Sequence, residues 1–206
     1  MIRANRIVLT SPVALLLTVG DASAHHLMGG KTPSTFAEGL LSGLGHPVIG
    51  PDHLAFLAAL GIAVGVARLS FLNSFLFLVA MACGVAAHVA AITIPAAELV
   101  VAISVLIAGV LLVANWRVPA GWWMALFMIA GFFHGYTYGE SIYGAEQTPL
   151  VAYLVGLVAI QTILVIGIAL ATRAAWSISG VAPRLAGAAI GGVGFAALIA
   201  QIVPAP

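Results

Sequence analysis

The sequence predicts an all-α fold: a polytopic membrane helix bundle with six transmembrane helices after a cleaved signal peptide, and a short half-helix before the first span. The first supporting observation is composition, because 63% of the 206 residues are hydrophobic and only 6% are charged. The mean hydropathy is accordingly +1.18. The second is a series of apolar runs long enough to cross about 30 Å of hydrocarbon at about 1.5 Å per residue. The third is that ionisable residues sort to the two ends of those runs.

Residues 1–24 have the pattern of a secretory signal peptide. A basic start is followed by the short apolar stretch Ile7–Val19 and by the small-residue cleavage site Ala22-Ser23-Ala24. The alternative is an uncleaved first helix, and Pro12 argues against it. The remaining residues, 25–206, are predicted to form a single transmembrane domain.

Apolar stretches after the signal are assigned as membrane spans by length and hydropathy. The segment Pro33–Gly45 is helical in pattern but too short to cross, so it is predicted to be an interfacial or re-entrant half-helix. Glycines four residues apart recur in the chain and predict close helix packing in lipid. The spans are 51–68, 71–93, 96–114, 119–138, 149–172 and 182–203, and the glycine motifs begin at Gly39, Gly61, Gly131 and Gly187.

The basic residues set the predicted orientation. With the mature N-terminus outside, four arginines fall in inner connections and only Lys31 stays outside, as the positive-inside rule requires. Every histidine and carboxylate of the mature chain then maps to the outer half. This sorting predicts a multi-pass protein of the bacterial inner (cytoplasmic) membrane whose outer side accepts a cation. The four arginines are Arg68, Arg117, Arg173 and Arg184.

The run from Gly45 to His53 places two histidines and an aspartate around a proline/glycine break. An aspartate at the centre of a membrane helix costs roughly 2.5–3.5 kcal/mol on insertion scales, so His46, Asp52 and His53 are candidate functional residues. Imidazole plus carboxylate is a ligand set for a divalent transition metal. Pro51 suits the first turn of a helix, and the backbone from Gly45 to Pro51 is predicted to be non-helical. The alternative is that Asp52 only caps the helix.

A second polar group lies near the end of the fourth span, where Tyr138 and Glu140 follow His134. His134 and Tyr138 are four residues apart and share a helical face. Glu140 is six residues from His134 and can join it only if the helix unwinds near Gly135 or Gly139. We predict His134 and Glu140 as metal ligands. The alternative is a polar helix end with interfacial tyrosines.

Other histidines and glutamates are weaker candidates for the same metal site. His88, near the end of the second span, is either a ligand or a packed core histidine, and Glu146 lies in a loop. The mature end, His25-His26, would combine an amine with two imidazoles. Glu98 follows a proline at a helix start, where a carboxylate favours the positive end of the dipole, so it is given a structural role.

Several classes of function are excluded. A net charge of +1 without a basic cluster excludes a nucleic-acid surface. The segment 29–32, Gly-Gly-Lys-Thr, matches the end of a phosphate-binding loop but lacks its upstream glycine and preceding strand, so ATP-driven pumping is not expected. No organic cofactor is predicted.

The two motifs together resemble the HupE/UreJ family of nickel/cobalt permeases. The resemblance rests on His46-x5-Asp52-His53, on the Phe-His-Gly around His134, on the signal with a histidine at the mature start and on the spans that follow. It covers essentially the whole mature chain. It implies Ni²⁺ or Co²⁺ as the transported substrate, delivery to hydrogenase or urease maturation proteins, and metal-site roles for His46, Asp52, His53 and His134.

The chain departs from the family pattern in the second motif, where Tyr138 stands at a position that is a second histidine in many members. A phenol is a poorer ligand for Ni²⁺ at neutral pH, so the selected ion is left open. The sequence as a whole predicts a permease that is not an enzyme, with the lipid bilayer and a metal ion as partners and with homo-oligomer formation open. The alternatives are a membrane-embedded metal-dependent enzyme, which would lack a His-Glu-x-x-His motif here, and a non-transporting metal-binding or sensor subunit.

Overall fold

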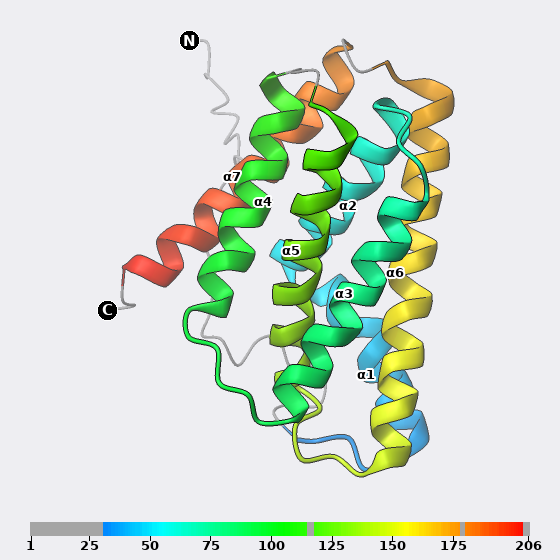
Figure 1. The fold of residues 1–206 in the computed structure, drawn as a ribbon, viewed down its shortest axis with the longest axis vertical. Coiled ribbons are helices and arrows are strands. Elements are labelled where there is room, and N and C mark those ends of the chain that lie inside the picture. The colour runs from blue at the N-terminus through cyan, green and yellow to red at the C-terminus, as the bar shows by residue number, and fades with distance from the viewer. Residues whose placement is uncertain (1–30, 115–117, 178–179, 204–206) are drawn as a thin grey trace, which may run out of the picture.

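The computed structural model describes residues 31–114, 118–177 and 180–203. Within these ranges the ordered elements are all helices, so the all-α prediction is confirmed for the described part of the chain. The predicted signal peptide and His25-His26 lie outside it. The helices are α1 (Phe36–Ile49), α2 (Pro51–Val66), α3 (Leu72–Val89), α4 (Ala97–Ala114), α5 (Ala120–Glu140), α6 (Gln147–Ala175) and α7 (Val181–Ile202) (Figure 1).

Each predicted span corresponds to one helix, and the helix ends lie within four residues of the predicted ones. By length and apolar composition, four described helices can cross a membrane, namely α3, α4, α6 and α7. The bent pair α1 and α2 adds a fifth if it is one broken span. A multi-pass helical membrane protein is thus supported, whereas six separate crossings remain a prediction.

The predicted break before the first span is much shorter than expected. His46 and Pro47 lie inside α1, and only Gly50 separates α1 from α2, with an extended backbone. The prediction of a non-helical backbone from Gly45 to Pro51 is therefore wrong. Hydrogen bonds explain the difference, because the Gly50 N–H still donates to the His46 carbonyl and the Leu54 N–H to the Gly50 carbonyl. The axes of α1 and α2 nevertheless differ by 77°.

Helix α6 supports both halves of this bent pair through the predicted glycine motifs. A Cβ on Gly43 of α1 would collide with the Tyr153 backbone, and one on Gly61 of α2 would lie against the Val165 carbonyl. Helix α1 therefore contacts the first half of α6, and α2 contacts its second half. The other two motifs act in the same way: the α5 glycines at 131, 135 and 139 pack on α3, and the α7 glycines at 187 and 191 pack on α4.

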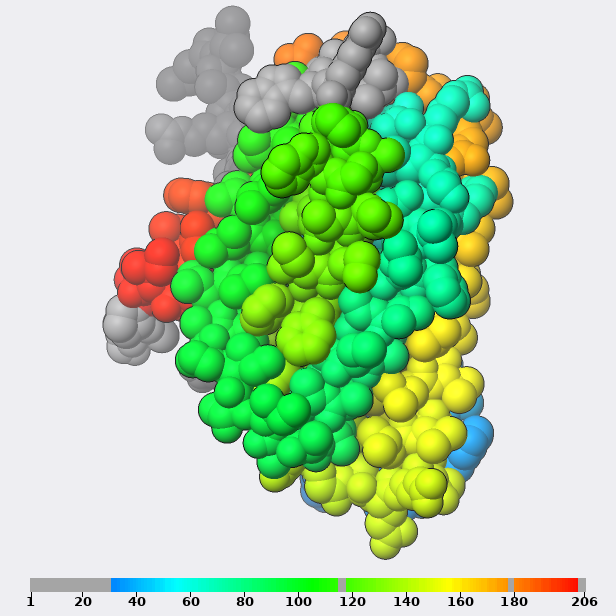
Figure 2. All heavy atoms as spheres, in the orientation of Figure 1, coloured from blue at the N-terminus to red at the C-terminus, as the bar shows by residue number. Residues whose placement is uncertain are grey.

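Helix α2 lies at the centre of the bundle, with most of its residues buried. The surrounding helices expose large apolar side chains on their outer faces, among them Phe75, Trp122 and Ile163. On the face shown in Figure 2, side chains of α3, α4 and α5 form a continuous surface. An exposed apolar surface of this extent is expected where the surrounding solvent is lipid.

Candidate functional site

Three histidines from three different helices meet in the interior of the bundle. His46 of α1, His53 of α2 and His134 of α5 are buried, with exposures of 5%, 6% and 1%. The Nδ1 atoms of His53 and His134 are 2.8 Å apart, and the rings of His46 and His53 lie edge to face with centroids 5.8 Å apart. The two sequence motifs are thus in direct contact at the bend between α1 and α2.

Aromatic side chains surround these imidazoles. The Tyr138 ring lies 4.3 Å from that of His53 and 4.9 Å from that of His46, measured between centroids. The Phe56 ring lies 4.7 Å from His134. We call His46, His53, His134, Tyr138 and Tyr153 the histidine–tyrosine cluster. Its polar atoms are shielded from lipid and from bulk water.

The hydrogen bonds of Ser104 determine which nitrogen of His134 carries the proton. The Ser104 hydroxyl donates to the Val101 carbonyl at 2.7 Å, and its oxygen lies 3.1 Å from His134 Nε2. Because a serine hydroxyl has one proton, Ser104 accepts from His134 Nε2–H. Neutral His134 therefore has its lone pair on Nδ1, and His53 Nδ1–H donates to it.

Tyr153 orients His46 in the same way. Its hydroxyl donates to the Tyr138 carbonyl at 2.8 Å, and its oxygen lies 2.9 Å from His46 Nδ1. Since the phenol proton is used, His46 Nδ1–H donates to Tyr153 and the His46 lone pair lies on Nε2. Histidines that bind metals are commonly oriented by such a bond to the other ring nitrogen.

The distance between His53 and His134 suits a cation as well as a proton. Bonds from imidazole nitrogen to a divalent transition metal are about 2.0–2.1 Å for zinc, so two nitrogens at a right angle on one ion lie about 3 Å apart. The observed separation is 2.8 Å. In the hydrogen bond, however, the two nitrogens point at each other, so an ion shared by both would require each ring to turn toward a point beside the line that joins them.

Asp52 lies in the first turn of α2 and is half-buried. Its Oδ1 accepts the backbone N–H of His53 at 2.8 Å. The N-cap of α2 is Gly50 and no side chain makes a cap hydrogen bond there, so this contact lies within the first turn and is not the capping role that the sequence offered as the alternative. It also fixes a carboxylate next to the histidine–tyrosine cluster.

Glu140 is not part of this cluster. The expected unwinding near Gly135 or Gly139 is absent, because α5 is helical to Glu140, and six residues along a regular helix place Glu140 on a different face from His134. Glu140 instead lines a cavity of about 310 Å³ at the end of the bundle where α3 and α5 end and α4 begins. The pairing of His134 with Glu140 is thus corrected to two separate groups.

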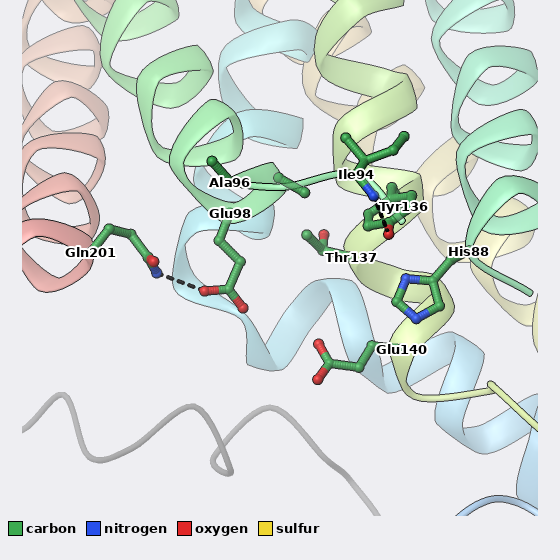
Figure 3. Close-up of a pocket in the computed structure, with 9 residues that line it drawn as sticks. His88, Ile94, Ala96, Glu98, Tyr136, Thr137, Glu140 and Gln201 are labelled. Atoms are coloured by element: carbon green, nitrogen blue, oxygen red, sulfur yellow. Dashed lines mark hydrogen bonds between the residues drawn. The ribbon is translucent and has the colours of Figure 1, made fainter. Parts of the chain in front are cut away.

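The carboxylates of Glu98 and Glu140 and the ring of His88 extend into this cavity, which we call the outer cavity after the orientation predicted from the sequence (Figure 3). Tyr136, Thr137 and Gln201 also line it. The Gln201 amide donates to Glu98 Oε2 at 2.7 Å, which ties α7 to the start of α4. His88 Nδ1 is buried and has no hydrogen-bond partner among the described residues.

The structure changes the interpretation of two glutamates, Glu98 and Glu146. Glu98, given only a helix-end role from sequence, shares the outer cavity with Glu140 and His88. Glu146 is exposed at the N-cap of α6 and is not among the cavity residues. In the part of the chain that the structure describes, no three His, Cys, Asp or Glu side chains are placed to hold a metal together, so the ligand assignments stay predictions.

Sequence reasoning missed Ser104 and Tyr153. Ser104 is, with Glu98, one of two polar residues in α4, and Tyr153 lies in the apolar α6. A polar side chain within a membrane helix is a functional hypothesis by default. That signal was present for both residues.

Comparison with known proteins identifies the family. A family model described as HupE / UreJ protein matches residues 13–197. The chain belongs to the HupE/UreJ family. It is also 27% identical to Protein HupE of Rhizobium leguminosarum bv. viciae over 194 residues, which cover 93% of this chain and 97% of that protein. No solved structure matches the chain significantly.

Membership confirms the resemblance drawn from the two motifs. HupE/UreJ proteins are transporter-type membrane proteins rather than enzymes, and the family is associated with nickel/cobalt uptake for hydrogenase or urease. In this HupE/UreJ protein, the first motif supplies two of the three imidazoles of the cluster and the second supplies the third.

The two tyrosines of the cluster allow a matched test of these contacts by unfolding. Tyr153→Phe should lower the free energy of unfolding by about 1–3 kcal/mol, because it leaves His46 Nδ1 and the Tyr138 carbonyl buried without their partner. Tyr138→Phe removes a hydroxyl that is buried without a partner among the described residues, so its effect should be neutral or stabilising by up to about 1 kcal/mol. Denaturant titration in mixed micelles measures both. Equal losses in the two variants would contradict the assigned network.

Proposed function

We propose that this HupE/UreJ protein is a permease that moves Ni²⁺, or alternatively Co²⁺, from the outer to the inner side of the bacterial cytoplasmic membrane, supplying hydrogenase or urease maturation. The observation that carries the proposal is the contact between His53 and His134 at the bend of a broken helix, with lone pairs oriented by Ser104 and Tyr153. Borderline divalent metals prefer imidazole nitrogen as a ligand. The cluster is buried, as a selective transport site requires.

The outer cavity is the entrance in this proposal. Glu98 and Glu140 concentrate cations there, and His88 offers one imidazole before the ion becomes fully buried. Clefts lined by charge of one sign raise the local concentration of the opposite ion. Loss of a cavity carboxylate should therefore reduce uptake most at low metal concentration.

The histidine–tyrosine cluster is the selective site. The ion would exchange water for Nδ1 of His53 and of His134 and, once the rings turn to bring the three nitrogens together, for Nε2 of His46. The proton that His53 Nδ1 gives up would move to Nε2 of the same ring, so that His53 binds as a neutral imidazole. Asp52 balances part of the added charge. Tyr138, which replaces the second histidine of the family pattern, contributes its ring to the wall of this site.

The proposed topology has α2 to α7 as six crossings and α1 as a re-entrant half-helix, with the mature N-terminus outside. Support comes from the separation of charges: His88, Glu98 and Glu140 lie at one end of the bundle. At the opposite end Arg173 donates to the Val64 and Leu69 carbonyls at 3.1 and 2.7 Å. An interior-negative membrane potential would favour entry of a divalent cation by roughly 4.6 kcal/mol per 100 mV, at about 2.3 kcal/mol per charge.

Uptake of radioactive nickel into proteoliposomes that contain the purified protein tests this function. Ni²⁺ should accumulate above protein-free liposomes, and excess Co²⁺ should compete more strongly than Zn²⁺ or Mg²⁺. Bound metal without accumulation would favour a non-transporting metal sensor and would contradict the proposal that the protein is a permease.

A pair of glutamate variants tests the entrance. Glu140→Gln should lower the initial rate severalfold at submicromolar Ni²⁺ and little at saturating Ni²⁺, because only the capture step loses charge. Glu146→Gln is the matched control, since that carboxylate is exposed outside the cavity, and it should behave as wild type. Equal initial rates of uptake in the two variants would show that the outer cavity is not part of the transport route.

A further inference from the structure

Gln161, in the middle of α6, is fully buried with 0% exposure. Neither its amide oxygen nor its amide nitrogen has a hydrogen-bond partner within the described ranges. In a membrane protein, polar groups that lipid cannot solvate are satisfied internally or face a hydrated or ligand-bearing space. An amide with both ends unpartnered at this depth therefore indicates a binding role.

The packing of α6 shows what Gln161 faces. The glycine Gly43 of α1 lies against the Leu157 amide, and Gly61 of α2 lies against the Val165 carbonyl. Gln161 is one helical turn from Leu157 and one from Val165, so it lies on the same face of α6 as both. Between these two contacts lies the junction of α1 and α2, whose axes differ by 77°. Gln161 thus lies on the face of α6 that packs on both arms of the bend, between its contacts with α1 and with α2.

The histidine–tyrosine cluster occupies the outer part of the same bend. Tyr153 of α6 holds His46 there, and Gln161 comes eight residues later, about 12 Å further along the helix axis. Leu157 packs with Tyr138 and Tyr153, whereas Val165 packs with the apolar centre of the bundle around Leu57 and Phe77. Gln161 therefore lies where the polar cluster gives way to the apolar core.

We propose that Gln161 is the next ligand on the inward route, accepting the divalent cation through its amide oxygen after the ion leaves the imidazoles; this inference rests on the transport function proposed above. A neutral oxygen binds a partly hydrated cation more weakly than three imidazoles do. Conduction needs sites that are favourable enough to enter and weak enough to leave. The amide N–H₂ group donates to the water that accompanies the ion.

The test separates binding from transfer in the purified full-length protein. Gln161→Met keeps the length of the side chain and removes its polar atoms. Equilibrium binding of radioactive Ni²⁺ should stay within twofold of wild type, while the initial rate of uptake into proteoliposomes should fall by tenfold or more. Gln161→Glu should bind Ni²⁺ more tightly and still transport it slowly, because the ion is held at the second position. Thr162→Val, at the neighbouring half-buried residue, is the matched control and should transport normally.

Each other outcome speaks against the inference. Wild-type transport by Gln161→Met would show that the amide takes no part in transfer. Loss of both binding and uptake would assign Gln161 to the first site or to folding, as would failure of the variant to fold. If the wild-type protein itself moves no Ni²⁺, the permease proposal fails instead, and the two failures are thereby distinguished.

Discussion

Removing two of the three clustered imidazoles, in the double variant His46→Ala/His134→Ala, is expected to reduce Ni²⁺ uptake to the level of protein-free liposomes. His134 contacts His53 directly, and His46 reaches the same space from α1. With both gone, His53 is the only imidazole of the cluster that remains. Each good metal–imidazole contact replaces a water molecule of the ion, so the buried site would no longer compensate for dehydration.

His88→Ala is the matched control for this double variant. It makes the same chemical change at a histidine of the outer cavity, outside the histidine–tyrosine cluster. Its uptake at saturating Ni²⁺ should approach that of wild type, whereas binding and uptake should both be lost in the double variant. Initial rates and equilibrium binding on equal amounts of folded protein give the comparison. Undiminished uptake by the double variant would refute the permease in the form proposed here.

The fold was predictable because its main signals are local. Apolar runs give the helices whatever the tertiary arrangement, and Pro51 begins α2 at the position that its missing N–H allows. The glycine motifs also identified packing faces, since a helix face without side chains lets a neighbouring helix approach closely. Gly39 and Gly43 on α6, and Gly131 and Gly135 on α3, illustrate this.

Three histidines of the candidate site were predicted from sequence, whereas Tyr153 and the arrangement of the site were not. Spacing alone indicated that His46, His53 and His134 carry function, but Glu140 was joined to them by assuming an unwound helix. Whether α5 unwinds depends on its packing against α3, which no local pattern reveals. His46 likewise remains helical because α6 holds α1 through Gly43 and Tyr153.

Tertiary contacts also decide the roles of Ser104 and Gln161. Ser104 acts by fixing the tautomer of His134, a residue thirty positions away. Gln161 acquires significance from its position on α6 between the contacts with α1 and with α2. From sequence alone, each is one of a few polar residues in an apolar helix, and nothing local indicates which partner it faces.

A bulky side chain at Gly43 is expected to separate α1, which carries His46, from α6. In Gly43→Leu the new Cβ would overlap the Tyr153 carbonyl oxygen and crowd the Leu157 amide, and both are backbone atoms that cannot turn aside. Helix α1 must then move off α6, which separates His46 from the Tyr153 hydroxyl. Overpacking typically costs about 1–3 kcal/mol and occasionally more. We expect stability to fall by at least that much and uptake to be lost.

The control for this prediction lies on α6 itself. A Cβ at Gly167 would meet nothing within 4 Å, so Gly167→Leu should fold and transport as wild type, with a small gain in helix propensity. Gly43→Ala adds the Cβ atom alone, and that atom already collides with backbone. The alanine variant should therefore show most of the loss of unfolding free energy and of initial uptake rate that the leucine variant shows. Normal stability and uptake in Gly43→Leu would mean that α1 does not pack on α6 as described. That result would also contradict the orientation of His46 by Tyr153.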